Sequence, residues 1–369
     1  TKTKMSPRQV STSFTAILLP IYYAFLIVVS NLDRYSVKAF TIRSEKCIKN
    51  KRMQHRLTTM TKTARHSWSQ SYATKTSSEI TIQSYSFRDW KLTYRLRSGN
   101  QMGTKSTVIM IHPVGVGIDS WFWTKLMDCW EDPSCDILAP DLIGCGMANG
   151  GDAWDPMQRA LSFPLGWVQG IEPLLLDGQS CCTVIVQGGL APVGLLLAAR
   201  NPTRVNNLIF CSPPTDLMTA VPPNELERNL AFLTNPFVSQ LAFGMILEQS
   251  WALRFFSNAF LFATPCDEDW IVTAQNNTTP LMRPAIAAFN AGMCQHRSFE
   301  SELRDLSQRI LILTGEKDRR DRQSYVDVMN DSTWIQVPNC CNVLPWEDPK
   351  QVYRIIQRFF VSGCVNLYC

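Results

Sequence analysis

The chain has 369 residues, 45% of them hydrophobic and 18% charged, which is enough for one globular domain with a large core and additional segments. The formal net charge of +5 is unevenly distributed. Residues 1–78 hold 14 Lys or Arg and only two acidic residues, Asp33 and Glu45, which leaves 22 basic and 29 acidic residues in 79–369. A net acidic body argues against nucleic-acid binding.

The first part of the chain has the pattern of a signal peptide. Residues 14–29 form an uncharged, mostly apolar run of 16 residues after Arg8, which is short for a membrane span and suits a signal-peptide core. Val37 and Ala39 are the small residues that a cleavage site requires. We therefore expect a signal peptide over 1–39, with a single membrane anchor as the alternative.

Residues 40–78 have a different composition. They are rich in Lys, Arg, Ser and Thr and almost free of acidic residues, which is typical of a transit peptide. A signal peptide followed by a transit peptide that opens on Phe40 resembles the two-part address of algae whose plastids lie inside extra membranes. The prediction is a plastid protein that keeps no transmembrane helix after processing. A disordered basic tail on a secreted protein is the alternative.

From about residue 79 strands and helices alternate. Residues 80–87 and 90–96 predict an antiparallel pair joined by a short polar turn. A continuous apolar run, typical of parallel strands covered on both faces, predicts a strand at 107–111. Further strands are expected at 137–139, 183–186, 205–211, 310–314 and 333–337. Helices are expected at 121–130, 164–176, 190–200 and 349–360. This alternation predicts an α/β domain over 79–369 with a doubly wound, mostly parallel sheet.

Between Cys211 and Arg309 the alternation stops, and a helical pattern rich in Phe follows. The phenylalanines are Phe232, Phe237, Phe243, Phe255, Phe256, Phe260 and Phe262. An insert at about 217–305 that lies over the carboxyl ends of the strands would form a cap on a ligand site. Its phenylalanines can pack against the sheet, line an apolar pocket, or dock on a membrane protein.

Several turns in a fixed order carry the candidate chemistry. They are the loop after His112, the Asp-x-x-Gly-x-Gly turn at 141–146, the strand-to-helix turn in 184–191, the turn at 315–318 and the loop at 338–346. Together they resemble the α/β-hydrolase superfamily over nearly all of 79–369. The His-Pro-x-Gly-x-Gly, Gln-Gly-Gly-Leu-Ala-Pro and Asn-Val-Leu-Pro-Trp-Glu-Asp segments are similar to a cyanobacterial and plastid branch of that superfamily.

In that superfamily a serine on a strained turn attacks an acyl carbon, a histidine takes its proton, an acid orients the histidine, and backbone N–H groups stabilise the oxyanion. The resemblance places Gly189 at the nucleophile position, Asn342 at the base position and Asp318 at the acid position. It implies Val114 and Leu190 as the oxyanion N–H donors. The predicted triad is therefore degenerate.

Two further observations support that interpretation. Shifting the turn by one residue places Leu190 at its apex, which is no nucleophile. Of the four histidines, His55 and His66 fall in the predicted transit segment, His112 is expected to brace its loop, and His296 is expected on the cap surface. Loss of nucleophile or base costs roughly a million-fold in turnover, so a triad hydrolase is not predicted.

Other polar residues have a structural and a functional interpretation. Asp141 either hydrogen-bonds the backbone of the turn at 144–146 or acts on a substrate. Cys340 could serve as a nucleophile only beside a cation, and Asp216 is an alternative acid position. The charged run at 316–322 predicts a solvated turn with weak ion pairs, or a site for an anionic partner.

The resulting prediction is a plastid protein with an α/β-hydrolase fold and no triad hydrolase activity. It would bind an apolar small molecule or serve as an accessory subunit of a plastid membrane complex. The alternative is an enzyme of hydrolase or lyase type with a non-standard site built on Asp318, Asn342 and the two N–H groups. No metal and no cofactor are expected. None of the 13 cysteines has the C-x-x-C spacing of a zinc or thioredoxin-type site.

Overall fold

The computed structural model describes residues 79–99, 106–146, 149–150, 154–156, 163–176, 181–240, 249–318, 322–329 and 332–365. The predicted signal and transit segments, 1–39 and 40–78, lie outside the described residues, and so does Phe243 of the cap.

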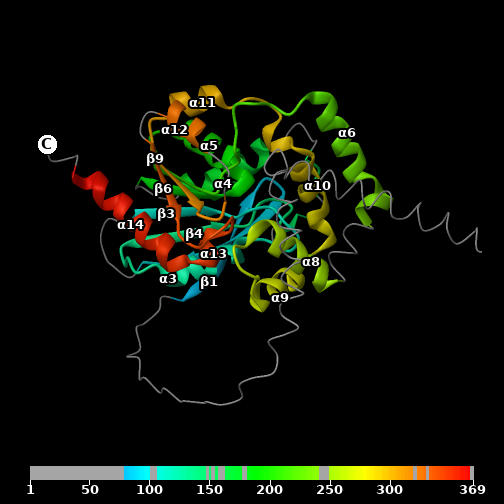
Figure 1. Ribbon diagram of the computed structural model, residues 1–369, viewed down its shortest axis with the longest axis horizontal. Helices are drawn as coiled ribbons and strands as arrows, with labels where there is room; N and C mark the ends of the chain where they lie inside the picture. The colour runs from blue at the N-terminus through cyan, green and yellow to red at the C-terminus, as the bar shows by residue number, and fades with distance from the viewer. Residues whose placement is uncertain are drawn as a thin grey trace, which may run out of the picture.

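A mostly parallel sheet forms the centre of the domain (Figure 1), with the strand order β1-β2-β4-β3-β6-β7-β8-β9. The strands are β1 (Ile80–Phe87), β2 (Trp90–Arg97), β3 (Ser106–Ile111), β4 (Cys135–Pro140), β6 (Cys182–Gln187), β7 (Val205–Cys211), β8 (Arg309–Gly315) and β9 (Ser332–Val337). A two-residue strand, β5 (Asn149–Gly150), pairs with β2. β2 is antiparallel to β1 and β4, and all pairs from β4 to β9 are parallel. The doubly wound sheet is confirmed.

The sheet separates two hydrophobic cores. Alternate residues of a strand point to opposite faces, so Val184 and Val186 enter one core and Ile185 the other. The first core is covered by α4 (Leu165–Leu176), α5 (Ala191–Arg200), α11 (Glu300–Asp305) and α12 (Gln323–Val328). The second is covered by α3 (Thr124–Cys129), α13 (Leu344–Glu347) and α14 (Pro349–Val365). All six residues of β6 are buried, as expected for a central parallel strand.

Two predicted helices differ in detail from the observed ones. The helix expected at 121–130 is divided into a 3-10 turn, η1 (Ser120–Trp123), and α3. Asp119 caps η1 by accepting a hydrogen bond from the N–H of Trp121 at 2.8 Å. The helix expected at 190–200 begins at Ala191, because another 3-10 turn, η3 (Gly188–Leu190), precedes it. The element types are as predicted, and only the ends differ.

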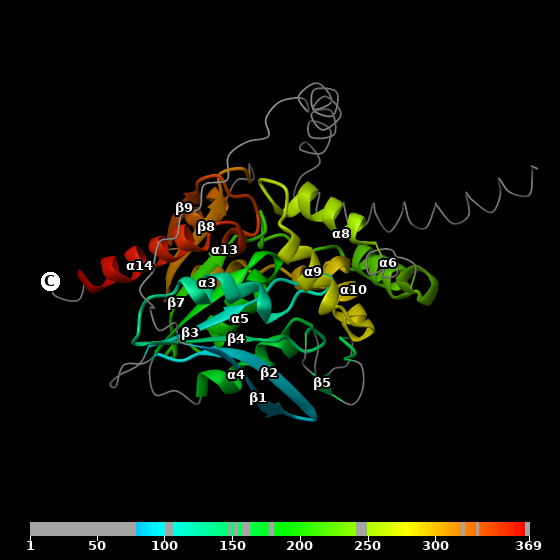
Figure 2. The same cartoon turned by 90° about the horizontal axis from the view of Figure 1, so that it is seen from below.

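The described residues between β7 and β8 are helical, as expected. The elements are α6 (Pro223–Thr234), α8 (Ser250–Phe256), η4 (Ser257–Leu261), α9 (Glu268–Asn276), η5 (Pro280–Met282), α10 (Arg283–Ala291) and η6 (Met293–Gln295). Figure 2 shows α6, α8, α9 and α10 together at one end of the sheet. A Cβ on Gly117, in the loop after β3, would lie 1.7 Å from the carbonyl oxygen of Ala274 on α9. The cap therefore rests directly on a loop at the carboxyl ends of the strands.

The aromatic residues of the cap are more exposed than core packing predicts. Phe262 is buried, but Phe237, Trp251 and Phe255 are 59%, 60% and 49% exposed. The cap thus carries an aromatic surface in addition to its share of the core. Within the described part of the chain, no helix combines the length and apolarity needed to cross a bilayer.

Candidate functional site

The turn between β6 and α5 has a left-handed backbone at Gly188. Its φ is 63°, in the left-handed region that costs an L-residue about 1–2 kcal/mol. A Cβ on Gly188 would meet no atom within 4 Å, whereas a Cβ on Gly189 would lie 2.5 Å from Cζ of Phe289 on α10. Only Gly188 has both the strained backbone and the room that a side chain at this turn needs.

The prediction that Gly189 stands at the apex of the turn is therefore wrong by one residue. Two adjacent glycines carry no local signal that tells which one becomes left-handed. The tertiary contact between Gly189 and Phe289 makes the distinction, because it excludes a side chain at the second glycine. The N–H that directly follows the strained residue consequently belongs to Gly189 and not to Leu190.

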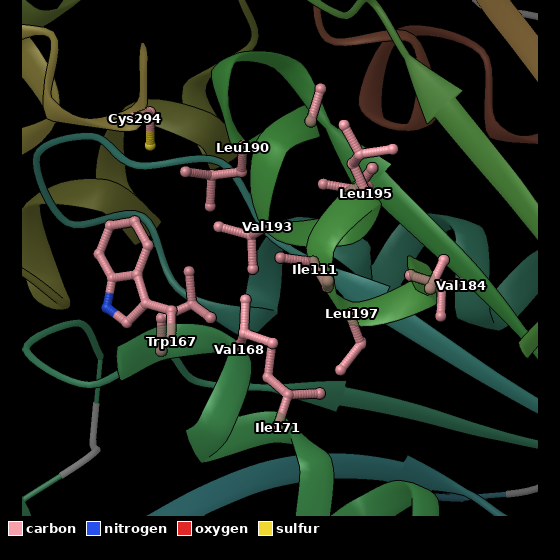
Figure 3. Close-up of a cluster of buried hydrophobic side chains, with 14 of the residues drawn as sticks. Ile111, Trp167, Val168, Ile171, Val184, Leu190, Val193, Leu195, Leu197 and Cys294 are labelled. Carbon is pink, nitrogen blue, oxygen red and sulfur yellow. The ribbon is translucent and has the colours of Figure 1, made fainter. Parts of the chain in front are cut away.

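Leu190 and Val114 have mainly apolar surroundings. Leu190 is fully buried in the cluster that also contains Val193 and Trp167 (Figure 3). Val114 is partly buried and packs against the same cluster from the loop after β3. Gly189 lies in the first turn of a helix, where backbone N–H groups have no acceptor within the helix. The turn therefore presents a backbone donor beside apolar side chains.

His112 braces two loops, as predicted. It is fully buried; its Nδ1 donates to the carbonyl oxygen of Pro113 at 2.8 Å, and its Nε2 accepts from the N–H of Leu142 at 3.2 Å. The pKa of His112 is lowered, because the effect of burial is larger than the opposing effect of the Asp141 charge. A neutral imidazole with both nitrogens engaged cannot serve as a base at the turn.

His296 lies on the cap surface, which confirms the second histidine prediction. The residue is exposed, its Nδ1 is 3.0 Å from the carbonyl oxygen of Met293, and its ring meets that of Phe299 edge-on. These contacts keep the imidazole within its own segment. Neither histidine of the described residues is placed to activate a nucleophile at Gly188.

Asn342 lies beside the turn, where the resemblance places the base. A Cβ on Gly315, at the end of β8, would be 2.2 Å from the carbonyl oxygen of Cys341, so glycine lets this loop cross the sheet edge. Nε2 of Gln187 donates to the carbonyl oxygen of Asn342 at 2.8 Å. The N–H of Asn342 donates to the carbonyl oxygen of Leu261 at 2.9 Å. Asn342 is thus held by its backbone against the side chain of Gln187, the residue before Gly188.

Asp318 follows β8 as expected, but its partner is a cation. Arg322 Nη2 lies 3.2 Å from Asp318 Oδ2, and the two side chains are only 0% and 4% exposed. Arg322 Nε also donates to the carbonyl oxygen of Pro213 at 2.9 Å. For these two residues the prediction of a solvated turn at 316–322 is wrong, because the i, i+4 spacing carries Arg322 under the loop after β7. A carboxylate held this way is not available to orient a histidine.

The cysteines of the loop after β9 are not activated. Burial, together with the neighbouring charges of Glu347 and Asp348, raises the pKa of Cys340 to about 12. The N–H of Cys341 donates to Glu347 Oε2 at 2.8 Å. A thiol in this environment stays protonated at neutral pH. In the ranges described, no three His, Cys, Asp or Glu side chains form a group that could hold a metal ion.

Asp141 supports the loop after β3, with partners other than the predicted ones. Its carboxylate accepts from Thr93 Oγ1 at 2.6 Å and from the N–H of Ser120 at 2.9 Å. The carboxylate of Asp141 was expected to accept from the backbone of the turn at 144–146, but its partners are Thr93 and Ser120. The reason is topological, because antiparallel pairing with β4 brings the first half of β2, with Thr93, beside Asp141.

Asp119 lies close to Asp141 beneath the same loop. A Cβ on Gly146 would be 2.6 Å from Cβ of Asp119 and 2.9 Å from Cγ of Asp141. Burial, followed by the charge of Asp141, raises the pKa of Asp119 to about 7. Arg95 is 3.9 Å away and only partly offsets these effects. This pair positions the loop and does not reach the turn at Gly188.

Two polar residues follow β7. Ser212 is 3% exposed and has a φ of 47°; its N–H donates to the carbonyl oxygen of Leu313 at 2.7 Å, and its Oγ has no hydrogen-bond partner among the described residues. Asp216, the alternative acid position, accepts from the N–H of Met218 at 2.6 Å and so stabilises a turn. Sequence reasoning did not single out Ser212, since nothing local marks a strained serine.

No protein-family model and no curated protein matches the chain. An epoxide hydrolase, CorEH, is similar with a TM-score of 0.58 and 17% identity over 77% of this chain and 99% of that one. The chain has an α/β-hydrolase fold.

Two other enzymes with this fold are similar to the same extent. The haloalkane dehalogenase DatA from Agrobacterium tumefaciens C58 has a TM-score of 0.58 and 17% identity over 77% of this chain and 97% of that one. The serine hydrolase CarC, involved in carbazole degradation, has values of 0.56 and 13% over 77% and 99%. Such identities establish the fold and leave the chemistry to the residues of the site.

Proposed function

We propose that this α/β-hydrolase-fold protein binds an uncharged, apolar small molecule under its cap and does not hydrolyse esters by a catalytic triad. Gly188 is the observation that carries the proposal. In hydrolases of this fold the strained turn exposes a nucleophile. The turn is retained with open space around the strained residue, but glycine supplies no nucleophile.

The residues around the turn offer no substitute base. His112 uses both ring nitrogens in the loop brace, and His296 lies on the cap surface. Asp318 is paired with Arg322, and Cys340 is a buried thiol. Proton transfer in acyl cleavage needs a group within hydrogen-bond reach of the reacting atoms. This arrangement therefore favours binding over turnover.

The surroundings of the turn favour an apolar ligand without charge. Phe289 lies over Gly189, and Leu190 and Val114 belong to the apolar cluster on one face of the sheet. The charge of Asp318 is compensated by Arg322, and the imidazole of His112 is neutral. An apolar site with a few polar groups is the usual composition of a small-molecule site.

Hydrolysis is tested by incubating the purified protein with short-chain aryl esters and with a fluorophosphonate probe, beside an active serine hydrolase. We expect neither turnover nor labelling of the native protein. Labelling that disappears after heat denaturation would reveal a hidden nucleophile and contradict the proposal. Ester turnover above that of denatured protein would favour the alternative, an enzyme that uses Asn342 and backbone N–H groups.

Binding is tested by extracting the native protein and identifying co-purifying apolar molecules by mass spectrometry. Gly188→Leu and Gly188→Ala form a matched pair, because both carry the same backbone strain and only Leu fills the open space. We expect the ligand with the wild type and with Gly188→Ala, and not with Gly188→Leu. Equal recovery from all three proteins would contradict a site at Gly188.

An accessory-subunit role has support from the cap. Phe237, Trp251 and Phe255 are about half exposed, and exposed aromatic groups mark interaction surfaces. Triple substitution by Ser should release the protein from a membrane complex isolated from its native source. Retention in the complex would contradict this second role.

For localisation, we propose import into a plastid with extra membranes, based on residues 1–78. A fluorescent protein fused to 1–78 should reach the plastid of an alga of that type, and a fusion to 40–78 should remain in the cytosol. Phe40→Ala in the longer fusion should stop it before the stroma. Secretion of the 1–78 fusion, or its retention at a membrane, would contradict the proposal.

A further inference from the structure

Ser212 has two costly features that the fold does not explain. It is a non-glycine residue with a left-handed φ of 47°, and its buried hydroxyl has no partner among the described residues. Strained backbone and unpaired buried polar groups both reduce stability, and both concentrate at functional sites. The backbone N–H alone, bonded to Leu313, continues the sheet. The side chain is thus available for another partner.

The strand register places Ser212 next to Gly188. β6 and β7 are parallel, and Gln187 is paired with Cys211, the last residues of their strands. Gly188 and Ser212 follow directly, on strands that are about 4.8 Å apart. Both residues have left-handed backbone. The unpaired hydroxyl of Ser212 therefore belongs to the residue next to Gly188, which has open space around it.

A second unpaired polar atom belongs to this strand end. Gln187 is 1% exposed; its Nε2 is bonded to the carbonyl oxygen of Asn342, and its Oε1 has no partner within the described ranges. An amide oxygen only accepts hydrogen bonds, whereas a serine hydroxyl donates or accepts. A ligand that satisfies both atoms needs a donor and an acceptor. A carboxylate lacks the donor, and a hydrocarbon lacks both.

We infer that Ser212, with Gln187, anchors the hydroxyl group of an uncharged apolar ligand that occupies the space at Gly188. A ligand hydroxyl accepts from Ser212 Oγ–H and donates to Gln187 Oε1, so the two unpaired atoms gain partners together. No bond is made or broken in the ligand. This inference rests on the proposed binding function and specifies the ligand class for the same site.

The test uses three probes of similar size: 2-naphthaleneethanol, 2-propylnaphthalene and 2-naphthaleneacetate. They carry a hydroxyl, no polar group and an anion, and their affinities for the full-length protein are measured by isothermal titration calorimetry. The wild type should bind the alcohol about tenfold more tightly than the hydrocarbon, which corresponds to one well-formed hydrogen bond. The acetate should bind most weakly.

The variants separate the hydroxyl from the fold. Ser212→Ala removes only Oγ and should abolish the preference for the alcohol, while hydrocarbon affinity and the unfolding midpoint stay at the wild-type level or rise. Ser212→Gly also relieves the backbone strain, which keeps the test decisive if Ser212→Ala folds poorly. Ser301→Ala, at an exposed serine on α11, is the control and should behave as the wild type.

The outcomes distinguish this inference from the function on which it rests. Equal affinity of the wild type for alcohol and hydrocarbon, or an unchanged preference in Ser212→Ala and Ser212→Gly, overturns the anchor and leaves apolar binding intact. A marked fall in the unfolding midpoint of both Ser212→Ala and Ser212→Gly shows that the hydroxyl has a structural partner and also overturns it. Failure of all three probes to bind the wild type contradicts the proposed function, and the anchor with it.

Discussion

Gly188 and Gly189 should respond to the same substitution for different reasons. Gly188→Ala meets no atom, so its cost is the left-handed backbone at φ 63°, about 1–2 kcal/mol. Gly189→Ala brings Cβ to 2.5 Å from Cζ and 2.7 Å from Cε2 of Phe289, and overpacking of this kind costs about 1–3 kcal/mol. The two costs are of similar size, so the stability of each single variant does not separate backbone strain from overpacking. Only the cost of Gly189→Ala should depend on the ring of Phe289.

The assay is a double-mutant cycle in the free energy of unfolding by urea. Phe289→Leu removes the ring atoms that the new Cβ would contact. In that background the cost of Gly189→Ala should fall by about 1 kcal/mol or more, while the cost of Gly188→Ala should stay the same. Gly188→Asn should cost less than Gly188→Ala, because Asn tolerates the left-handed region.

Two results would refute this reasoning. If Gly189→Ala costs the same with Phe and with Leu at position 289, the cap helix α10 does not rest on the turn. If Gly188→Ala is neutral and Gly189→Ala is relieved by exchange to Asn, the strained residue is Gly189, as the sequence-based alignment had it.

Three other predictions concern buried polar groups. Arg322→Met should cost about 3–5 kcal/mol by urea unfolding, because it leaves Asp318 buried without its cation; a loss below about 1 kcal/mol would count against the pair. The raised pKa of Asp119, about 7, makes the folded state bind a proton that the unfolded state releases above about pH 4. Stability from this group is therefore present at low pH and is lost as the pH rises to about 7. Asp119→Asn should gain stability relative to the wild type over that interval, and a constant difference would contradict the shift. His112→Phe leaves the N–H of Leu142 without its acceptor and should cost about 1–3 kcal/mol in thermal unfolding; an unchanged midpoint would show that the brace is dispensable.

The strands were predictable because of their burial. A parallel strand covered on both faces has to be largely apolar, so runs such as 310–314 were recognisable, and the observed β8 spans Arg309–Gly315. Helix ends were less predictable. Where η1 precedes α3, the division depends on the cap supplied by Asp119.

The approach of Asn342 to the turn was also predictable, since the carboxyl ends of parallel strands share one edge of the sheet. The partners of the polar side chains were not. Asp318 and Arg322 are four residues apart in a charged run, and burial of the pair depends on Pro213 and the loop after β7. Asp141 finds Thr93 on β2, 48 residues away.

The order of apolar runs and glycine turns in the sequence was by itself sufficient for the α/β architecture, because apolar periodicity records which faces each element buries. It also led to the prediction that Gly and Asn stand where a nucleophile and a base would be expected. Only the tertiary structure decided that Gly188 carries the strain, that Phe289 closes the space over Gly189, and that Ser212 stands beside the open position. Backbone strain and side-chain clearance depend on atoms brought together from distant parts of the chain, and local sequence does not encode those distances.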